Sequence, residues 1–341
     1  MSLNPSKFFS KKRVYLAIFI GLSISGYLLY SELNQVDFKN QLLKMSWTVQ
    51  SFMFLVLALI MMIVRDFAYM IRLRILTDNK LSWKQSLKII LMWEFASAVS
   101  PGVVGGSAVA MFFLNKEKIP LGKSSTLVIT TALFDNLFYI LFVPLTVLLI
   151  GLNDLMPSQI GTEYLNYFWV GYGVICLISL ILVISLFIYP KLIKYILEIV
   201  FKLPYLNKRK DKGNKIARDI IIASKELKVR SAMFWIKLMG STALSWTARF
   251  FVVNCILMAF VSLSFQDNVL IFTRQLMMWL ILLVTPTPGG SGMAEYLFGT
   301  FLGDYLPIGL LVVVTSILWR LISYYPYLFI GSLILPKWLK K

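Results

Sequence analysis

Long apolar runs separated by short charged segments are the main pattern in this sequence, and they predict membrane-spanning helices. A helix needs roughly 20 mostly apolar residues to cross the hydrocarbon core of a bilayer. Runs that approach this length without an internal break cover residues 14–30, 47–64, 125–150, 167–189, 238–263 and 306–335. We therefore expect an all-α polytopic membrane protein, with residues 1–341 forming a single transmembrane domain.

Two further apolar stretches, 87–114 and 269–302, are interrupted by proline and glycine. Proline removes a backbone donor and glycine permits left-handed backbone, so a continuous helix is not expected in either stretch. In hydrocarbon, an opened backbone is tolerated only where protein or a water-filled cavity satisfies its polar groups. We interpret both stretches as re-entrant hairpins whose tips line a substrate site. The tip residues are Pro101, Gly105, Gly106 and Ser107 in the first hairpin, and Pro288, Gly289, Gly290, Ser291 and Gly292 in the second.

The positions of lysine and arginine predict the orientation, because these residues collect in cytoplasmic loops. If each hairpin returns to the face from which it enters, the basic segments 65–88, 116–123 and 190–237 all lie in the cytoplasm, together with both termini. If both stretches crossed fully, the most basic loop would be exported, against a bias of about 1 kcal/mol per basic residue. We therefore predict six spanning helices, with one hairpin entering from the cytoplasm and one from outside.

This topology relates the two halves of the chain as an inverted repeat. Helix 47–64, hairpin 87–114 and helix 125–150 correspond to helix 238–263, hairpin 269–302 and helix 306–335. The small residues from Gly105 to Ala110 also resemble those from Gly289 to Ala294. Inverted repeats place substrate at their interface near the midplane. The alternative is two independent kinked helices whose small residues serve packing.

The net charge of +18 does not indicate a nucleic-acid partner, because basic loops beside spanning helices account for it. Within 190–237, Ile216, Ile220, Ala223 and Leu227 recur at helical intervals among lysines and arginines. This spacing predicts an amphipathic helix on the cytoplasmic leaflet, and a solvated basic loop is the alternative.

Several kinds of chemistry have no support in the sequence. The chain has no histidine, which removes imidazole acid–base catalysis and imidazole metal ligands. Cys176 and Cys255 fall inside apolar runs and are expected to be buried hydrophobic residues. No nucleotide-binding motif of the form G-x-x-x-x-G-K-[ST] occurs, so transport would be passive or ion-coupled. We expect no metal and no cofactor.

Ionisable residues inside the apolar runs are the strongest candidates for a site. Each costs about 2.5–3.5 kcal/mol in a membrane unless it is paired or lines a polar path. We expect them to converge with the hairpin tips, with the arginines binding an anionic headgroup through directed hydrogen bonds. The alternative is a set of closed pairs, such as Arg320 with Glu295 or Arg249 with Asp135. Arg65, Arg72 and Arg74 are interpreted as boundary residues of the second helix, although the first two share a helical face. Arg249 and Arg274 lie nearer the ends of their helices, and snorkelling to the membrane surface is the alternative for them. The candidates are Glu94, Asp135, Arg249, Arg274, Glu295 and Arg320.

These motifs together resemble a flippase-like family that includes the transmembrane region of lysylphosphatidylglycerol synthase. The resemblance covers nearly the whole chain and rests on Pro101-Gly102, Gly105-Gly106, Asp135, Pro288 to Gly292 with Glu295, and Trp319-Arg320. Many relatives have an acidic residue where Gly106 stands and a basic one near Ala110, so the first hairpin departs from the commoner charge pattern.

The resemblance implies a bacterial inner-membrane protein that moves, or helps to move, a lipid between leaflets. Full-length synthase relatives carry a soluble aminoacyl-transferring domain after the membrane region. This chain ends at Lys341, so lysyl transfer is not expected.

The first hypothesis for function is a flippase or lipid-transport protein for an anionic phospholipid or a polyprenyl-phosphate-linked lipid. An intramembrane transferase that acts on a lipid carrier is an alternative, although no Asp-x-Asp motif and no histidine occur. A non-catalytic membrane partner of a cell-envelope enzyme is a further alternative.

Overall fold

The computed structural model describes residues 47–100, 104–151, 163–189, 210–283 and 289–339, together with a few isolated positions. Most of the predicted first helix, 14–30, lies outside these residues, as do Pro101, Gly102 and Pro288. The described segments are helical and contain no strand. The all-α class predicted from the apolar runs is therefore confirmed.

Five helical segments in the described part of the chain are long and apolar enough to cross a membrane. Each of them corresponds to one of the predicted runs. They are α4 (Val49–Leu76), α7 (Leu121–Ile150), α8 (Glu163–Val183) with the π-helical turn Ile184–Ile188, α11 (Ala232–Met258), and the pair α14 (Gly309–Ser323) and α15 (Tyr325–Leu339).

Helix α4 is longer than the predicted run 47–64. It begins at a capping box in which the Thr48 and Ser51 side chains each bind the other residue's backbone, and it continues to Leu76. Arg65 and Arg72 lie within it and are buried, with 1% and 6% of their surface exposed. The interpretation of these two arginines as boundary residues is therefore wrong. The two arginines interrupt the apolar run, but the helix continues through them because each forms an ion pair with a carboxylate in the protein interior.

The run 306–335 is two helices instead of one. The helix axis is interrupted at Tyr324, which has φ −126° and separates α14 from α15. Pro326 follows at the second position of α15 and has no amide hydrogen with which to continue the ladder from α14. The Tyr324 ring lies directly against Gly289, where an added Cβ would come within 2.2 Å of it. The break therefore seats an aromatic ring against the second glycine turn.

Each of the two broken stretches forms a pair of short helices that pack on each other. The first pair is α5 (Trp83–Val99) with α6 (Val104–Lys116), and the second is α12 (Phe265–Leu283) with α13 (Met293–Leu302). With a rise of about 1.5 Å per residue, α6 is about 20 Å long and α13 about 15 Å. Neither of these two helices reaches the length of roughly 30 Å that a hydrocarbon core requires.

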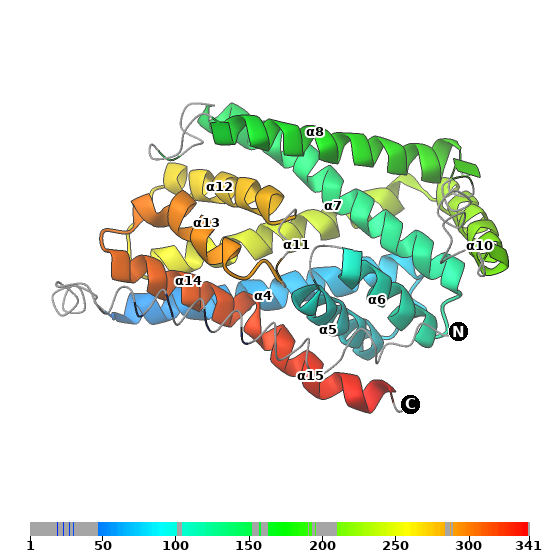
Figure 1. The fold of residues 1–341 in the computed structure, drawn as a ribbon, viewed down its shortest axis with the longest axis horizontal. Coiled ribbons are helices and arrows are strands. Elements are labelled where there is room, and N and C mark those ends of the chain that lie inside the picture. Colours follow the sequence, from blue (N-terminus) through cyan, green and yellow to red (C-terminus); the bar gives the residue numbers. More distant parts are fainter. Residues whose placement is uncertain are drawn as a thin grey trace.

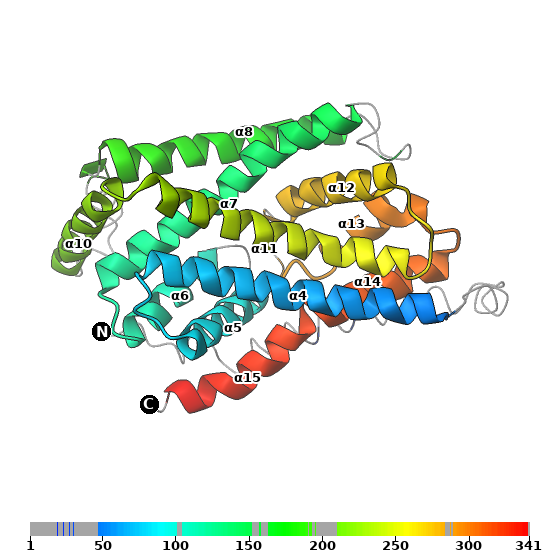
Figure 2. The same cartoon turned by 180° about the vertical axis from the view of Figure 1, so that it is seen from behind.

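The two short pairs lie at opposite ends of the bundle. Figures 1 and 2 show α5 and α6 toward the end of the bundle where α10 (Lys210–Lys228) also lies, and α12 and α13 toward the other end. Helices α4 and α11 pack along each other through the centre. Helix α5 packs on α15 and α12 packs on α7, while α6 packs on α7 and α13 on α14. Each short pair therefore contacts long helices from both halves of the chain.

Helix α10 forms as predicted, but its apolar side faces protein. Ile220, Ala223 and Leu227 are buried, and α10 packs on α7. At Gly122 of α7 an added Cβ would lie 1.9 Å from the side chain of Asp219, so the two helices approach closely. The predicted contact of this face with the lipid leaflet is therefore wrong for these three residues.

Candidate functional site

The second glycine turn is held by a closed ion pair. Gly289, Gly290 and Gly292 all have positive φ, between 58° and 88°, a conformation that glycine adopts without strain. Glu295 accepts a hydrogen bond from the Gly292 amide at 2.7 Å, and its carboxylate pairs with Arg320 at 2.9 Å. Arg320 also donates to the Gly289 carbonyl at 3.1 Å. The pair thus fixes both ends of the turn.

This pair lies deep inside the protein. Glu295 and Arg320 are 4% and 5% exposed, and the neighbouring Ser291 is 1% exposed. Their hydrogen-bonding capacity is directed at each other and at the turn. Glu295 and Arg320 therefore form a closed ion pair that holds the turn in place.

The tip of the first hairpin is closely packed. Gly106 lies against Ser97 of α5, where an added Cβ would come 2.0 Å from the Ser97 hydroxyl oxygen. Gly105 and Ser107 lie in the first turn of α6, and Ser107 is half-buried. Pro101 precedes this helix and lies outside the described residues. Glycine at 106 thus allows the two arms to meet.

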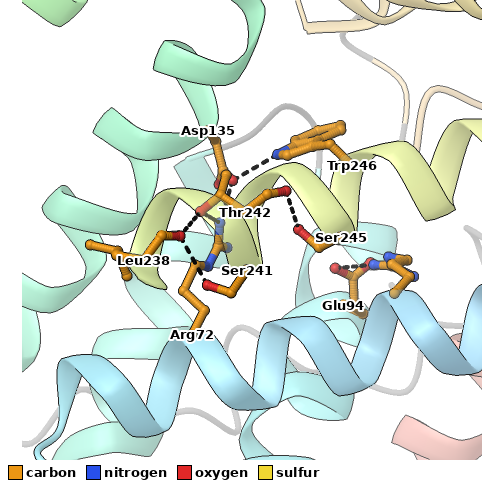
Figure 3. Close-up of polar contacts among 9 residues, drawn as sticks. Arg72, Glu94, Asp135, Leu238, Ser241, Thr242, Ser245 and Trp246 are labelled. Carbon is orange, nitrogen blue, oxygen red and sulfur yellow. Dashed lines mark hydrogen bonds and ion pairs between the residues drawn. The ribbon is translucent and has the colours of Figure 1, made fainter. Parts of the chain in front are cut away.

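Asp135 is bound from two sides. Figure 3 shows its carboxylate between Arg72 of α4 and Trp246 of α11. The indole Nε1 of Trp246 donates to Asp135 at 2.8 Å, and Arg72 also reaches the Thr242 hydroxyl at 3.4 Å. The partner of Asp135 is therefore Arg72, and the pairing of Asp135 with Arg249 considered from the sequence does not form.

Glu94 is bound by a buried arginine that sequence reasoning placed at a helix boundary. Arg65 forms ion pairs with Glu94 and with Asp66, the latter at 3.5 Å. It also donates to the Tyr327 hydroxyl at 2.9 Å, and Tyr327 in turn donates to Asp66 at 2.7 Å. The sequence signal for Arg65 was the helical face that it shares with Arg72, seven residues further along α4.

Arg274 closes the end of the second short pair. Its guanidinium donates to the Asp304 carboxylate at 2.7 Å and to the Phe301 carbonyl at 3.0 Å. The Tyr305 ring lies beneath it, 5.4 Å from the guanidinium carbon. This arginine therefore ties α12 to the residues that follow α13.

Arg249 differs from the other deep arginines. It is half-buried and lies over the Trp246 ring at 5.3 Å, and no carboxylate of the described residues is within ion-pair distance of it. It is close enough to Glu94 and Asp66 to act on both electrostatically. A permanently charged planar guanidinium in this position can give two directed hydrogen bonds to a phosphate.

The pairing of Arg320 with Glu295 predicts a strong coupling between the two residues. Arg320→Met leaves Glu295 buried without its partner, and we expect a loss of about 3–5 kcal/mol of stability. The double variant Arg320→Met with Glu295→Gln should recover much of this loss, because glutamine still accepts from the Gly292 amide. Thermal unfolding in detergent gives the stability of each variant in this double-mutant cycle.

The control is Arg230→Met, which breaks the more exposed ion pair with Asp78 and should change the stability by about 0–1 kcal/mol. If the stability loss of the double variant equals the sum of the losses of the two single variants, the prediction is wrong.

Comparison with known proteins agrees with the helical architecture. The sequence model of the family described as "Lysylphosphatidylglycerol synthase TM region" matches residues 14–331. A UPF0104 membrane protein of Archaeoglobus fulgidus is 23% identical over 326 residues, which cover 90% of this chain and 94% of that protein. No solved structure matches the chain. The chain therefore belongs to the family of lysylphosphatidylglycerol synthase transmembrane regions.

Proposed function

We propose that this protein carries an anionic lipid between the leaflets of a membrane, and that Arg249 binds the phosphate group of the lipid. The family takes its name from the membrane region of an enzyme named for a phospholipid, which favours a lipid as the ligand. An anionic phospholipid and a polyprenyl-phosphate-linked lipid both supply the phosphate that a guanidinium recognises.

The observation that carries this proposal is that the guanidinium of Arg249 forms no ion pair with a carboxylate of the described residues. Arg65, Arg72, Arg274 and Arg320 each have a carboxylate within ion-pair distance, and Arg249 has none among the described residues. A cation in the membrane interior is costly without a partner, so one that lacks a partner in the protein is suited to an anionic ligand.

The position of Arg249 supports an inverted repeat with the site at its centre. Gly289 follows Gly105 by 184 positions, and Arg249 follows Arg65 by the same 184. The same shift carries the end of α5 at Val99 onto Leu283, the end of α12. Arg249 and Arg65 are thus equivalent residues on the two central helices, and inverted repeats bind substrate where such helices meet.

The packing of the short helices supports their assignment as re-entrant hairpins. The contact of α5 with α15 has a counterpart in that of α12 with α7, and the contact of α6 with α7 has one in that of α13 with α14. Matching contacts of this kind are expected when the two halves of a chain are related by a two-fold axis in the membrane plane. We propose that the first pair enters from the cytoplasm and the second from outside, in a bacterial cytoplasmic membrane.

The proposed topology predicts which residues are accessible from each side. In a background without Cys176 and Cys255, single cysteines at Lys84 and Lys118 flank the first pair, and cysteines at Gln266 and Pro307 flank the second. All four positions are exposed. A membrane-impermeant maleimide added to intact cells should label the Gln266 and Pro307 positions and leave the other two unlabelled until the cells are opened. Labelling of the two flanks of one pair from opposite sides means that the pair crosses the membrane.

The proposed phosphate site predicts a transport defect in Arg249 variants. In vesicles with fluorescent phosphatidylglycerol, dithionite quenching should report lipid exchange that is faster than in empty vesicles. Arg249→Gln should slow the exchange by about tenfold or more, because a hydrogen bond to a charged group is worth about 1.5–3 kcal/mol. Arg249→Lys, which keeps the charge but not the planar fork, should lie between the two.

The matched control for this experiment is Lys237→Gln, which removes an exposed cation from the same helix. It should exchange lipid at the rate of the unaltered protein. Equal rates for the unaltered protein and Arg249→Gln would remove Arg249 from the site, and equal rates for the unaltered protein and empty vesicles would end the transport proposal.

A further inference from the structure

Four charged side chains on α4, α5 and α11 form a group that we call the central cluster: Arg65, Asp66, Glu94 and Arg249. Helices α5 and α11 both pack on α4, which carries Arg65 and Asp66. Arg65 is 1% exposed and touches both carboxylates. Arg249 acts electrostatically on the same two carboxylates from α11. With two cations and two carboxylates, the cluster has a net charge of zero when all four groups are ionised.

The central cluster is less completely bonded than the closed pair of Glu295 and Arg320. Among the described residues, the buried Nε of Arg65 and Oδ1 of Asp66 have no hydrogen-bond partner. The other Asp66 oxygen accepts from Tyr327, and that tyrosine accepts from Arg65. Arg65 thus serves two acids, while Arg249 has no carboxylate of the described residues within ion-pair distance, so the cluster keeps hydrogen-bonding groups that a further ligand can use.

An anion bound at Arg249 changes this balance of charge. A lipid phosphodiester carries one negative charge, so its arrival gives the cluster a net charge of −1 in surroundings that penalise charge. A proton taken up by one carboxylate restores neutrality: the carboxylate and the proton form a neutral carboxyl group, and no other bond changes. Because the two acids share Arg65, the proton belongs to the pair and not to either residue alone.

We infer that binding of an anionic phosphodiester lipid at Arg249 is coupled to the uptake of one proton by the Asp66–Glu94 pair. This inference rests on the proposed phosphate site. The lipid anion and the proton then cross the membrane together as an electrically neutral load. A proton gradient can therefore drive the lipid in one direction without nucleotide hydrolysis.

The groups around the pair are compatible with this coupling. Asp66 faces Arg65 on its own helix, Glu94 on α5, Arg249 on α11 and Tyr327 on α15. Glu94 faces Arg65, Arg249 and the more distant Arg72. Arg72 is already neutralised by Asp135, and the rings of Tyr69 and Tyr327 cover Arg65 as uncharged partners. Only the four members of the central cluster therefore enter the charge balance.

Isothermal titration calorimetry counts the proton directly. The full-length protein in detergent is titrated with dihexanoyl phosphatidylglycerol in two buffers that have the same pH and different ionisation enthalpies. The difference between the two heats should correspond to one proton taken up per lipid bound. With rising pH, the Kd should increase by about tenfold for each pH unit once the free pair is ionised.

Two variants and a second probe separate this inference from the proposed function. Asp66→Asn and Glu94→Gln each leave the cluster with one positive charge, so the phosphodiester neutralises it without a proton. Both variants should bind phosphatidylglycerol with equal heats in the two buffers and with an affinity that does not depend on pH. Dihexanoylglycerol, which lacks the phosphate, should not bind.

The outcomes are distinct. If the unaltered protein binds phosphatidylglycerol with equal heats in the two buffers, the coupling is wrong and the phosphate site stands. If the proton count persists in both variants, the proton is taken up elsewhere and the inference is overturned. If phosphatidylglycerol does not bind, or binds no better than dihexanoylglycerol, the phosphate site and the coupling fail together.

Discussion

The constraint on which the structure depends is that a charge inside the membrane region needs an opposite charge beside it. The resulting ion pairs join segments that lie apart in the sequence. Arg72 joins α4 to α7 through Asp135, Arg65 joins α4 to α5 through Glu94, and the turn before α13 is bound to α14 through Arg320. Because a broken pair leaves a buried charge, these contacts specify how the helices are arranged as well as holding them together.

The two central arginines connect the same constraint to the proposed phosphate site. In the proposed inverted repeat, Arg65 and Arg249 are equivalent positions on α4 and α11, 184 residues apart, yet their surroundings differ. Arg65 is enclosed by Asp66, Glu94 and Tyr327, whereas Arg249 has the face of Trp246 and no carboxylate of the described residues within ion-pair distance. The proposed repeat accounts for the presence of two arginines, and the difference in their surroundings is the reason for proposing Arg249 as the ligand-binding one.

Apolar runs and turn residues predicted the helices well, because the length of an apolar run and the positions of proline and glycine are local properties. The bounds were less predictable. The hydropathy profile predicts that the second helix ends at Arg65, because it contains the charge of Arg65 but no information on Glu94, whose carboxylate stabilises the buried arginine. It also joins α14 to α15, although Pro326 was a local signal for the break at Tyr324.

Side-chain partners could not be predicted from the sequence. Asp135 binds Arg72 and not Arg249, because α7 presents it to α4 and to the indole of Trp246. Similarly, the apolar side of α10 is identifiable from its spacing, but only the fold shows that α7 covers it. Helix packing decides which charges form ion pairs and which do not, and the proposed function rests on this property.

The most direct test of this account is a high-resolution structure of the protein in a bilayer nanodisc that contains phosphatidylglycerol. We expect density for a lipid phosphate within hydrogen-bond distance of the Arg249 guanidinium, with Glu94 still bound to Arg65. A structure in which Arg249 is closed on a carboxylate of the protein, and in which lipid phosphates lie only at the two membrane surfaces, would contradict it.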